Sequence, residues 1–168
     1  MKKIVMFDGE IETQQYFTYR MREEFQRLGH EVYTFNLSKT GESLTGLMRF
    51  VEQGNTALVC FNFHGITPGD IFWQDGEWFW DAIECTCYNI VVDHPFYYHR
   101  FLDVAPKRYV HISIDRKHDL YMQKYFPEKL RIPFLPLAGT EYRPKGYLPI
   151  RERKTDIVFT GNYSPLCR

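Results

Sequence analysis

The stretch TALVCFNFHG, residues 56–65, decides the fold class of this chain. It is a strongly apolar run that ends in a histidine and a glycine. Near-continuous apolar runs are typical of strands that are covered on both faces, as in the parallel sheets of α/β proteins. The stretch therefore predicts a buried central strand, with polar groups directly after its carboxyl end.

Similar strand-like runs recur on both sides of this stretch, at residues 3–7, 31–37, 88–92 and 109–114. Apolar residues at helical spacing separate them and predict helices at residues 13–28, 38–53 and 115–126, with shorter ones at 78–86 and 97–104. Thr13 is predicted to cap the first helix, residues 66–77 to form a loop, and residues 129–137 to be extended. Strands that alternate with helices imply parallel βαβ units. We therefore predict a Rossmann-like α/β domain with a doubly wound, mainly parallel sheet.

The composition excludes several classes of protein. With 44% hydrophobic and 17% aromatic residues among 168, the chain is not disordered and can bury a core. Its 21 basic and 21 acidic residues cancel, so the charge gives no reason to expect a nucleic-acid partner. No apolar run reaches the roughly 18 residues of a membrane span, and the start lacks a signal peptide, so we expect a cytoplasmic protein.

The cysteines predict buried thiols. Cys60 lies inside the apolar run and is expected to act as a small hydrophobic side chain. Cys85 and Cys87 form a C-x-C pair with no second pair, whereas zinc sites usually combine C-x2-C pairs or histidines at a set spacing. Reduced structural thiols are therefore favoured over zinc, and no metal site is predicted.

The end of the chain differs from the rest. Residues 141–154 are polar, contain two prolines and are typical of a connector between domains. Residues 155–165 then return to a strand-like pattern followed by a Gly-Asn pair. We predict a first domain over residues 1–140, a connector over 141–154 and the beginning of a second domain over 155–168, as expected if the chain is the front part of a larger protein.

In open α/β sheets, ligands bind beyond the carboxyl ends of the strands, where Asp8, His64, Asp93, His94 and Asp115 follow apolar runs. A carboxylate or imidazole there can take a proton from an attacking hydroxyl. Pro95 would keep His94 extended and hold the Asp93-His94 pair in place. The alternative is structural: Asp93 caps the following helix, and His94 packs against aromatic side chains.

Three further features have both a functional and a structural interpretation. His64 precedes Gly65, where a ligand can approach the backbone closely, but it can equally be a partly buried structural histidine. The aromatic residues 71–80, with Trp73 among them, can stack on sugars or bases, or can form a hairpin or helix packed on the sheet. Gly161 and Asn162 can open a phosphate-binding turn. The chain has neither G-x-G-x-x-G after its first strand nor a P-loop, which argues against a dehydrogenase and a P-loop enzyme.

Three segments taken together resemble a known family: VVDHP at residues 91–95, FLPLAGTEYRP at 134–144 and KTDIVFTGNYSP at 154–165. In this order and spacing they are similar to the bacterial glycosyltransferases related to spore maturation protein CgeB. The matching positions are Asp93 and Pro95, residues 135–138 and residues 156–162. The first half of the chain matches in layout more than in motif.

This resemblance implies the two-domain GT-B arrangement, with an N-terminal acceptor-side domain and a C-terminal domain that holds a nucleotide-sugar substrate, usually without a bound metal or other cofactor. Asp93 becomes the leading candidate for the base, followed by His94. The implied acceptor-binding residues are His64, Asp8, Tyr97 and Trp73, and the implied donor-binding residues are Gly161 and Asn162. The acceptor can be a glycan, a protein, a lipid-linked sugar or a small molecule.

Most of the donor domain would lie beyond these residues, so we expect no transfer by this chain alone. The alternative from a different class is a non-catalytic α/β module that binds a ligand or a protein partner.

Overall fold

The structure is a computed structural model that describes residues 1–8, 11–137, 148–155 and 157. Contacts divide the chain into two units, Met1–Leu137 and Ala138–Arg168. Within the second unit the described residues include one short 3-10 helix, η3 (Ile150–Glu152). Gly161, Asn162 and nearly all of the strand predicted at residues 155–165 lie outside the described residues. The fold below is that of the first unit.

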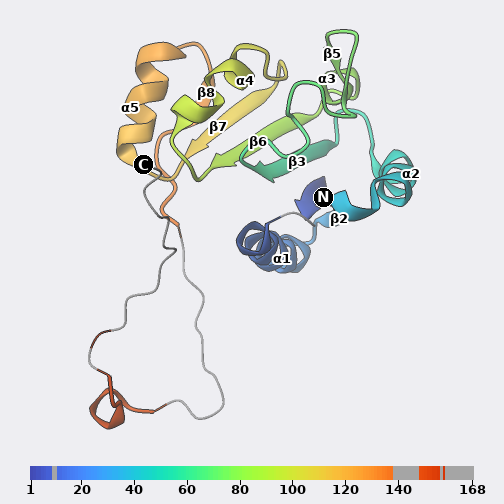
Figure 1. Ribbon diagram of the computed structural model, residues 1–168. Coiled ribbons are helices and arrows are strands. Elements are labelled where there is room, and N and C mark those ends of the chain that lie inside the picture. The colour runs from blue at the N-terminus through green and yellow to red at the C-terminus, as the bar shows by residue number, and fades with distance from the viewer. Residues whose placement is uncertain (9–10, 138–147, 156, 158–168) are drawn as a thin grey trace, which may run out of the picture. The chain divides into compact units, whose positions relative to one another are not determined.

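The first unit is built on a six-stranded sheet in which each neighbouring pair of strands is parallel (Figure 1). The strands are β1 (Lys3–Asp8), β2 (Glu31–Asn36), β3 (Thr56–Phe61), β6 (Thr86–Val91), β7 (Tyr109–Ser113) and β8 (Leu130–Ile132). Their spatial order is β2-β1-β3-β6-β7-β8, so the order reverses between β1 and β3. This is the order of flavodoxin-like doubly wound sheets with one strand added. The predicted fold class is confirmed.

Helices cover both faces of the sheet. They are α1 (Glu12–Arg27), α2 (Thr40–Phe50), α3 (Phe79–Ala82), α4 (His99–Asp103) and α5 (Arg116–Tyr125). The apolar side of α1 packs on a core that includes Ile4 and Met6 of β1. The alternate residues Val5 and Phe7 belong to a second, larger core, which also contains buried residues of α2, α3, α4 and α5. The strands are therefore apolar on both faces, as the continuous runs in the sequence predict.

Three local predictions needed correction. The segment at 66–77 contains a hairpin of β4 (Trp73–Gln74) and β5 (Glu77–Trp78). Its turn residues, Asp75 and Gly76, both have positive φ, the conformation that two-residue hairpin turns favour. The helix predicted at 78–86 shrinks to α3, because β6 begins at Thr86. Thr13 is no cap: Ile11 precedes α1, without a side-chain hydrogen bond.

Two further segments are refined by the structure. A 3-10 turn, η2 (Pro95–Tyr98), comes first in the helical segment predicted at 97–104, and α4 follows it. Residues 129–137 contain the edge strand β8, which pairs with β7.

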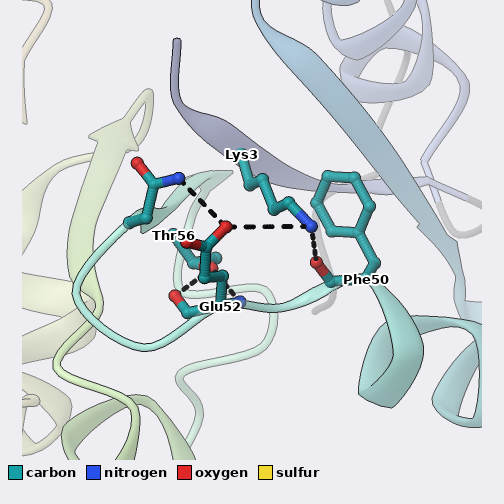
Figure 2. A network of polar contacts seen from close by, with 5 residues as sticks. Lys3, Phe50, Glu52 and Thr56 are labelled. Atoms are coloured by element: carbon teal, nitrogen blue, oxygen red, sulfur yellow. Dashed lines mark hydrogen bonds and ion pairs between the residues drawn. The ribbon is translucent and has the colours of Figure 1, made fainter.

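At the amino edge of the sheet, a polar network ties β1 to the connection between α2 and β3 (Figure 2). Lys3 Nζ donates to the carbonyl of Phe50 at 2.9 Å and lies 4.0 Å from Glu52 Oε2. The Thr56 hydroxyl accepts from Glu52 N and donates to Glu52 O, both at 2.8 Å. Thr56 is buried, so its hydroxyl replaces water for the amide of Glu52, whose carbonyl also accepts from the amides of Asn55 and Thr56.

The cysteines and helices agree with two other expectations. Cys60, Cys85 and Cys87 are buried free thiols, and burial raises the pKa of the Cys60 thiol, which confirms its role as a small buried side chain. None of the described helices has the length and apolar character needed to cross a membrane.

Candidate functional site

The carboxyl ends of β1, β3, β6 and β7 lie next to one another at one edge of the sheet, because these strands are adjacent and parallel. Asp8 ends β1, Asn62 and His64 follow β3, Asp93 and His94 follow β6, and Asp115 follows β7. The prediction that these polar groups share one edge is therefore confirmed. Whether they share one site depends on the direction of each side chain.

Asn62 connects the end of β3 to the segment that follows β6. Its side-chain oxygen accepts from Val92 N at 2.9 Å, and its side-chain nitrogen donates to Asp93 Oδ2 at 2.9 Å. Its backbone has a φ of 46°, in the left-handed region that asparagine tolerates better than most residues. Asn62 is absent from the candidate residues predicted from the sequence. Its one sequence signal is a polar side chain inside the apolar FNF triplet.

Asp93 has one anchored carboxylate oxygen. Oδ2 accepts from Asn62 and, at 3.1 Å, from the hydroxyl of Tyr98. Burial, followed by the hydrogen bond and charge of Asp93, raises the pKa of Tyr98 to about 12, so this phenol stays protonated and donates at neutral pH. Asp93 is exposed, and its Oδ1 has no partner among the described residues. The side chain therefore presents one oriented oxygen to solvent.

His94 both caps the following turn and packs against aromatic rings. The structural interpretation of the sequence had given the first of these roles to Asp93 and the second to His94. Its Nδ1 accepts from Phe96 N at 3.1 Å and caps η2, a role which that interpretation gave to Asp93. Its ring packs edge-on against His118 and Tyr121, with centroids 5.0 and 5.2 Å away. Because Nδ1 is an acceptor, a neutral His94 carries its proton on Nε2. It can donate a hydrogen bond there.

His118 joins this cluster from the first turn of α5. Burial lowers the pKa of His118, and the nearby His94 lowers it further, while Asp115 and Asp93 oppose the shift. Its Nδ1 is buried and has no hydrogen-bond partner within the described part of the chain. Asp115 itself caps α5 by accepting from Lys117 N at 2.7 Å. The sequence offered only a weak signal for His118, its position three residues after a polar strand end.

An aromatic cavity of about 470 Å³ adjoins this cluster. It is lined by Phe96, Tyr97, His99, Arg100, Phe101, Tyr121 and Tyr125. Phe96 and Tyr97 are 65% and 74% exposed, which is high for large aromatic side chains. Tyr121 links the cavity to the cluster, since its ring packs against His94 and its hydroxyl lies 2.7 Å from His99 Nδ1. Among the predicted acceptor-binding residues, Tyr97 is the one that lines this cavity.

The other predicted acceptor-binding residues lie elsewhere. His64 lines a separate cavity of about 430 Å³ beside Gly65 and Asp70, and Asp8 lines another of about 370 Å³. Trp73 packs edge-on against Trp78 in the hairpin, with centroids 4.5 Å apart, and contacts the core. This arrangement is the packed hairpin of the structural interpretation. The predicted residues thus share an edge but do not line a common cavity.

A buried polar chain supports the site from inside the core. Asn89 Oδ1 accepts from Phe63 N at 3.1 Å, and Asn89 Nδ2 donates to the Tyr109 hydroxyl at 3.2 Å. That hydroxyl lies 2.9 Å from His111 Nδ1. Burial lowers the pKa of His111 to about 4, so this histidine is neutral at neutral pH. Asn89 therefore holds the backbone of the left-handed turn from which Asn62 reaches Asp93.

Nowhere in the described ranges do three histidine, cysteine, aspartate or glutamate side chains form a group that could hold a metal ion. Comparison of the chain with protein-family models, with curated proteins and with solved structures finds no match.

Proposed function

We propose that this chain is the acceptor-side domain of a glycosyltransferase that uses a nucleotide-sugar, and that Asp93 is the base for the acceptor hydroxyl. The observation that carries the proposal is the Asp93 carboxylate, which has one anchored oxygen and one oxygen without a partner among the described residues. It lies in the same segment as Phe96 and Tyr97, which line the aromatic cavity. The doubly wound parallel sheet and the resemblance of residues 91–95 to the CgeB-related enzymes support it.

The proposed reaction needs one proton acceptor on this domain. The acceptor hydroxyl gives its proton to Asp93 Oδ1, and its oxygen forms a bond to the anomeric carbon of the donor sugar. The bond from that carbon to the diphosphate breaks, and its electron pair leaves with the nucleotide diphosphate. The hydrogen bonds from Asn62 and Tyr98 keep the carboxylate oriented, which lowers the cost of reaching the reactive geometry.

The aromatic cavity supports a carbohydrate acceptor. Aromatic faces stack on the apolar C–H faces of sugar rings, and Phe96 and Tyr97 expose such faces. Its volume of about 470 Å³ lies in the range of small-ligand sites. Arg100 adds a positive group to the lining, which favours an acceptor with an anionic substituent. We assign His94 as a hydrogen-bond donor through Nε2, because capping occupies its other nitrogen.

The test uses the full reading frame that contains these residues. Nucleotide-sugars are screened first by thermal shift, since a ligand that binds only the folded state raises the melting temperature. Transfer to a glycan panel is then measured for the wild type and for Asp93→Asn, which preserves size but cannot accept the proton. We expect the variant to lose at least about a hundredfold in kcat with an unchanged melting temperature. Asp103→Asn, at the exposed end of α4, is the matched control and should keep the wild-type rate.

A wild-type rate in Asp93→Asn would refute the assignment of the base. If no nucleotide-sugar stabilises a well-folded protein, the second candidate function is favoured, a non-catalytic α/β module. The exposure of Phe96 and Tyr97 supports that candidate as well, because contiguous exposed aromatic side chains are typical of docking surfaces.

A further inference from the structure

The cavity lined by Asp8 is polar and lies between α1 and the strands β1 and β2. This is the face of the sheet opposite to the aromatic cavity. It is lined by Asp8, Glu12, Gln15, Tyr16, Thr18, Tyr19, Arg22 and Thr34. Asp8 continues the alternation of Ile4 and Met6, which pack with Phe17, Met21 and Phe25 of α1. The cavity shares no lining residue with the aromatic cavity lined by Phe96 and Tyr97. It is therefore a separate candidate site.

Two buried polar atoms in this cavity have no hydrogen-bond partner among the described residues, Asp8 Oδ1 and Thr34 Oγ1. The two residues project from neighbouring strands, since Met6 pairs with Thr34 and Asp8 pairs with Asn36. Buried polar atoms are almost always paired in folded proteins, because an unpaired one loses its hydration without compensation. A carboxylate oxygen and a hydroxyl that both lack partners indicate an occupant that donates hydrogen bonds.

The cavity also contains a positive group that has no ion-pair partner in the described ranges. The Arg22 guanidinium stacks over the ring of Tyr19, 4.9 Å from its centroid, and makes no ion pair or hydrogen bond with the described part of the chain. It shares this lining with two acidic residues, Asp8 and Glu12. Burial raises the pKa of Asp8, and the charge of Arg22 opposes that shift. Opposite charges thus line one cavity without pairing with each other.

This combination restricts the chemistry of the occupant. A simple cation would be repelled by Arg22, and a simple anion would face the two carboxylates. A molecule with both charges satisfies all of these groups. We propose that the cavity binds a small zwitterion of the free amino-acid type, with its ammonium group on Asp8 and Thr34 and its carboxylate on Arg22. The volume of about 370 Å³ is large enough for such a ligand. The proposal does not depend on the glycosyltransferase function.

The test is titration calorimetry of the purified 168-residue chain with the standard free L-amino acids up to about 10 mM, a range that detects weak binding. For each amino acid that binds, the N-acetyl and amide derivatives are also titrated, because each derivative removes one charge. We expect at least one free amino acid to bind, and both of its derivatives to bind at least about tenfold more weakly. Mg²⁺ and Ca²⁺ are titrated in parallel.

Variants then locate the binding site. Asp8→Asn and Arg22→Gln should each weaken binding by at least about tenfold while thermal unfolding shows a folded chain. Arg27→Gln is the matched control, because Arg27 lies on the same helix but pairs with Glu24 outside the cavity, and it should bind like the wild type. The proposal is overturned if no free amino acid binds, if the derivatives bind equally well, if only the metal ions bind, or if Arg22→Gln and Arg27→Gln behave alike.

Discussion

Replacement of Gly65 by alanine should destabilise the domain through a clash with Phe7. Gly65 has a φ of +74°, and a Cβ added there would collide with the Phe7 ring. That ring cannot easily move away, because it packs against Phe35, Phe72 and Trp80 with centroids 5.2, 5.8 and 6.5 Å away. The backbone is also held, since Trp80 Nε1 donates to the Gly65 carbonyl at 2.6 Å.

Two effects add to the expected magnitude. A left-handed conformation costs a non-glycine residue about 1–2 kcal/mol. Forcing one extra carbon into a well-packed core costs about 1–3 kcal/mol more. The expected loss for Gly65→Ala is therefore about 2–5 kcal/mol, a large fraction of the total stability of a typical domain, about 5–15 kcal/mol.

The assay is equilibrium urea unfolding, followed by tryptophan fluorescence, on Gly65→Ala and on the matched control Gly69→Ala. Gly69 also has a positive φ, of +87°, but its added Cβ would meet nothing within 4 Å. The control should lose only the backbone part, about 1–2 kcal/mol. If the two variants lose the same free energy of unfolding within about 0.5 kcal/mol, the clash with Phe7 does not exist. Phe7→Leu should recover part of the loss when combined with Gly65→Ala.

Other predictions concern the polar contacts. Thr56→Val should lower the free energy of unfolding by about 1–3 kcal/mol because it leaves the amide of Glu52 without its hydrogen-bond acceptor, whereas the exposed Thr45→Val should change it little; equal urea midpoints would contradict this. His111 resists protonation in the folded state, where its pKa is about 4 against the usual 6.5. The free energy of unfolding is therefore unaffected by this group above pH 6.5 and falls by about 3 kcal/mol on acidification to pH 4. His111→Asn should flatten the stability profile in that window, and an unchanged profile would exclude His111 as the titrating group. Asn62→Ala should leave Asp93 without its shortest hydrogen bond and lower kcat about tenfold in the full protein with KM nearly unchanged; a fall in stability alone would make Asn62 a purely structural residue.

The candidate site was only partly predictable, because chain position does not determine side-chain direction. Asp8, His64 and Asp93 were correctly expected at one edge, since parallel adjacent strands end there together. They line different cavities or surfaces, because alternate residues of a strand point to opposite faces and the loops after β3 and β6 turn differently. Asn62 belongs to the site because its side chain reaches from the end of β3 to Asp93, a contact that the sequence does not indicate.

The pair Asp93-His94 illustrates the same limit at the level of single atoms. Both the catalytic and the capping interpretation are compatible with the letters DHP. The choice between them depends on which nitrogen of His94 faces the amide of Phe96, and on which carboxylate oxygen meets Asn62 and Tyr98. Phe96 and Tyr98 lie in η2, directly after the pair, but Asn62 comes from the segment after β3, so no local pattern predicts the contact that anchors Asp93.

The sequence alone determined the parallel, doubly wound sheet, because that fold depends on where apolar runs and helical spacing occur along the chain. It also determined that polar groups would gather at the carboxyl edge. Only the tertiary structure decided which groups meet: the anchoring of Asp93, the capping by His94, and the separation of Asp8 with Arg22 into a cavity of its own. The physical reason is that secondary structure follows from local periodicity, whereas a site is made by directional contacts between residues far apart in the chain.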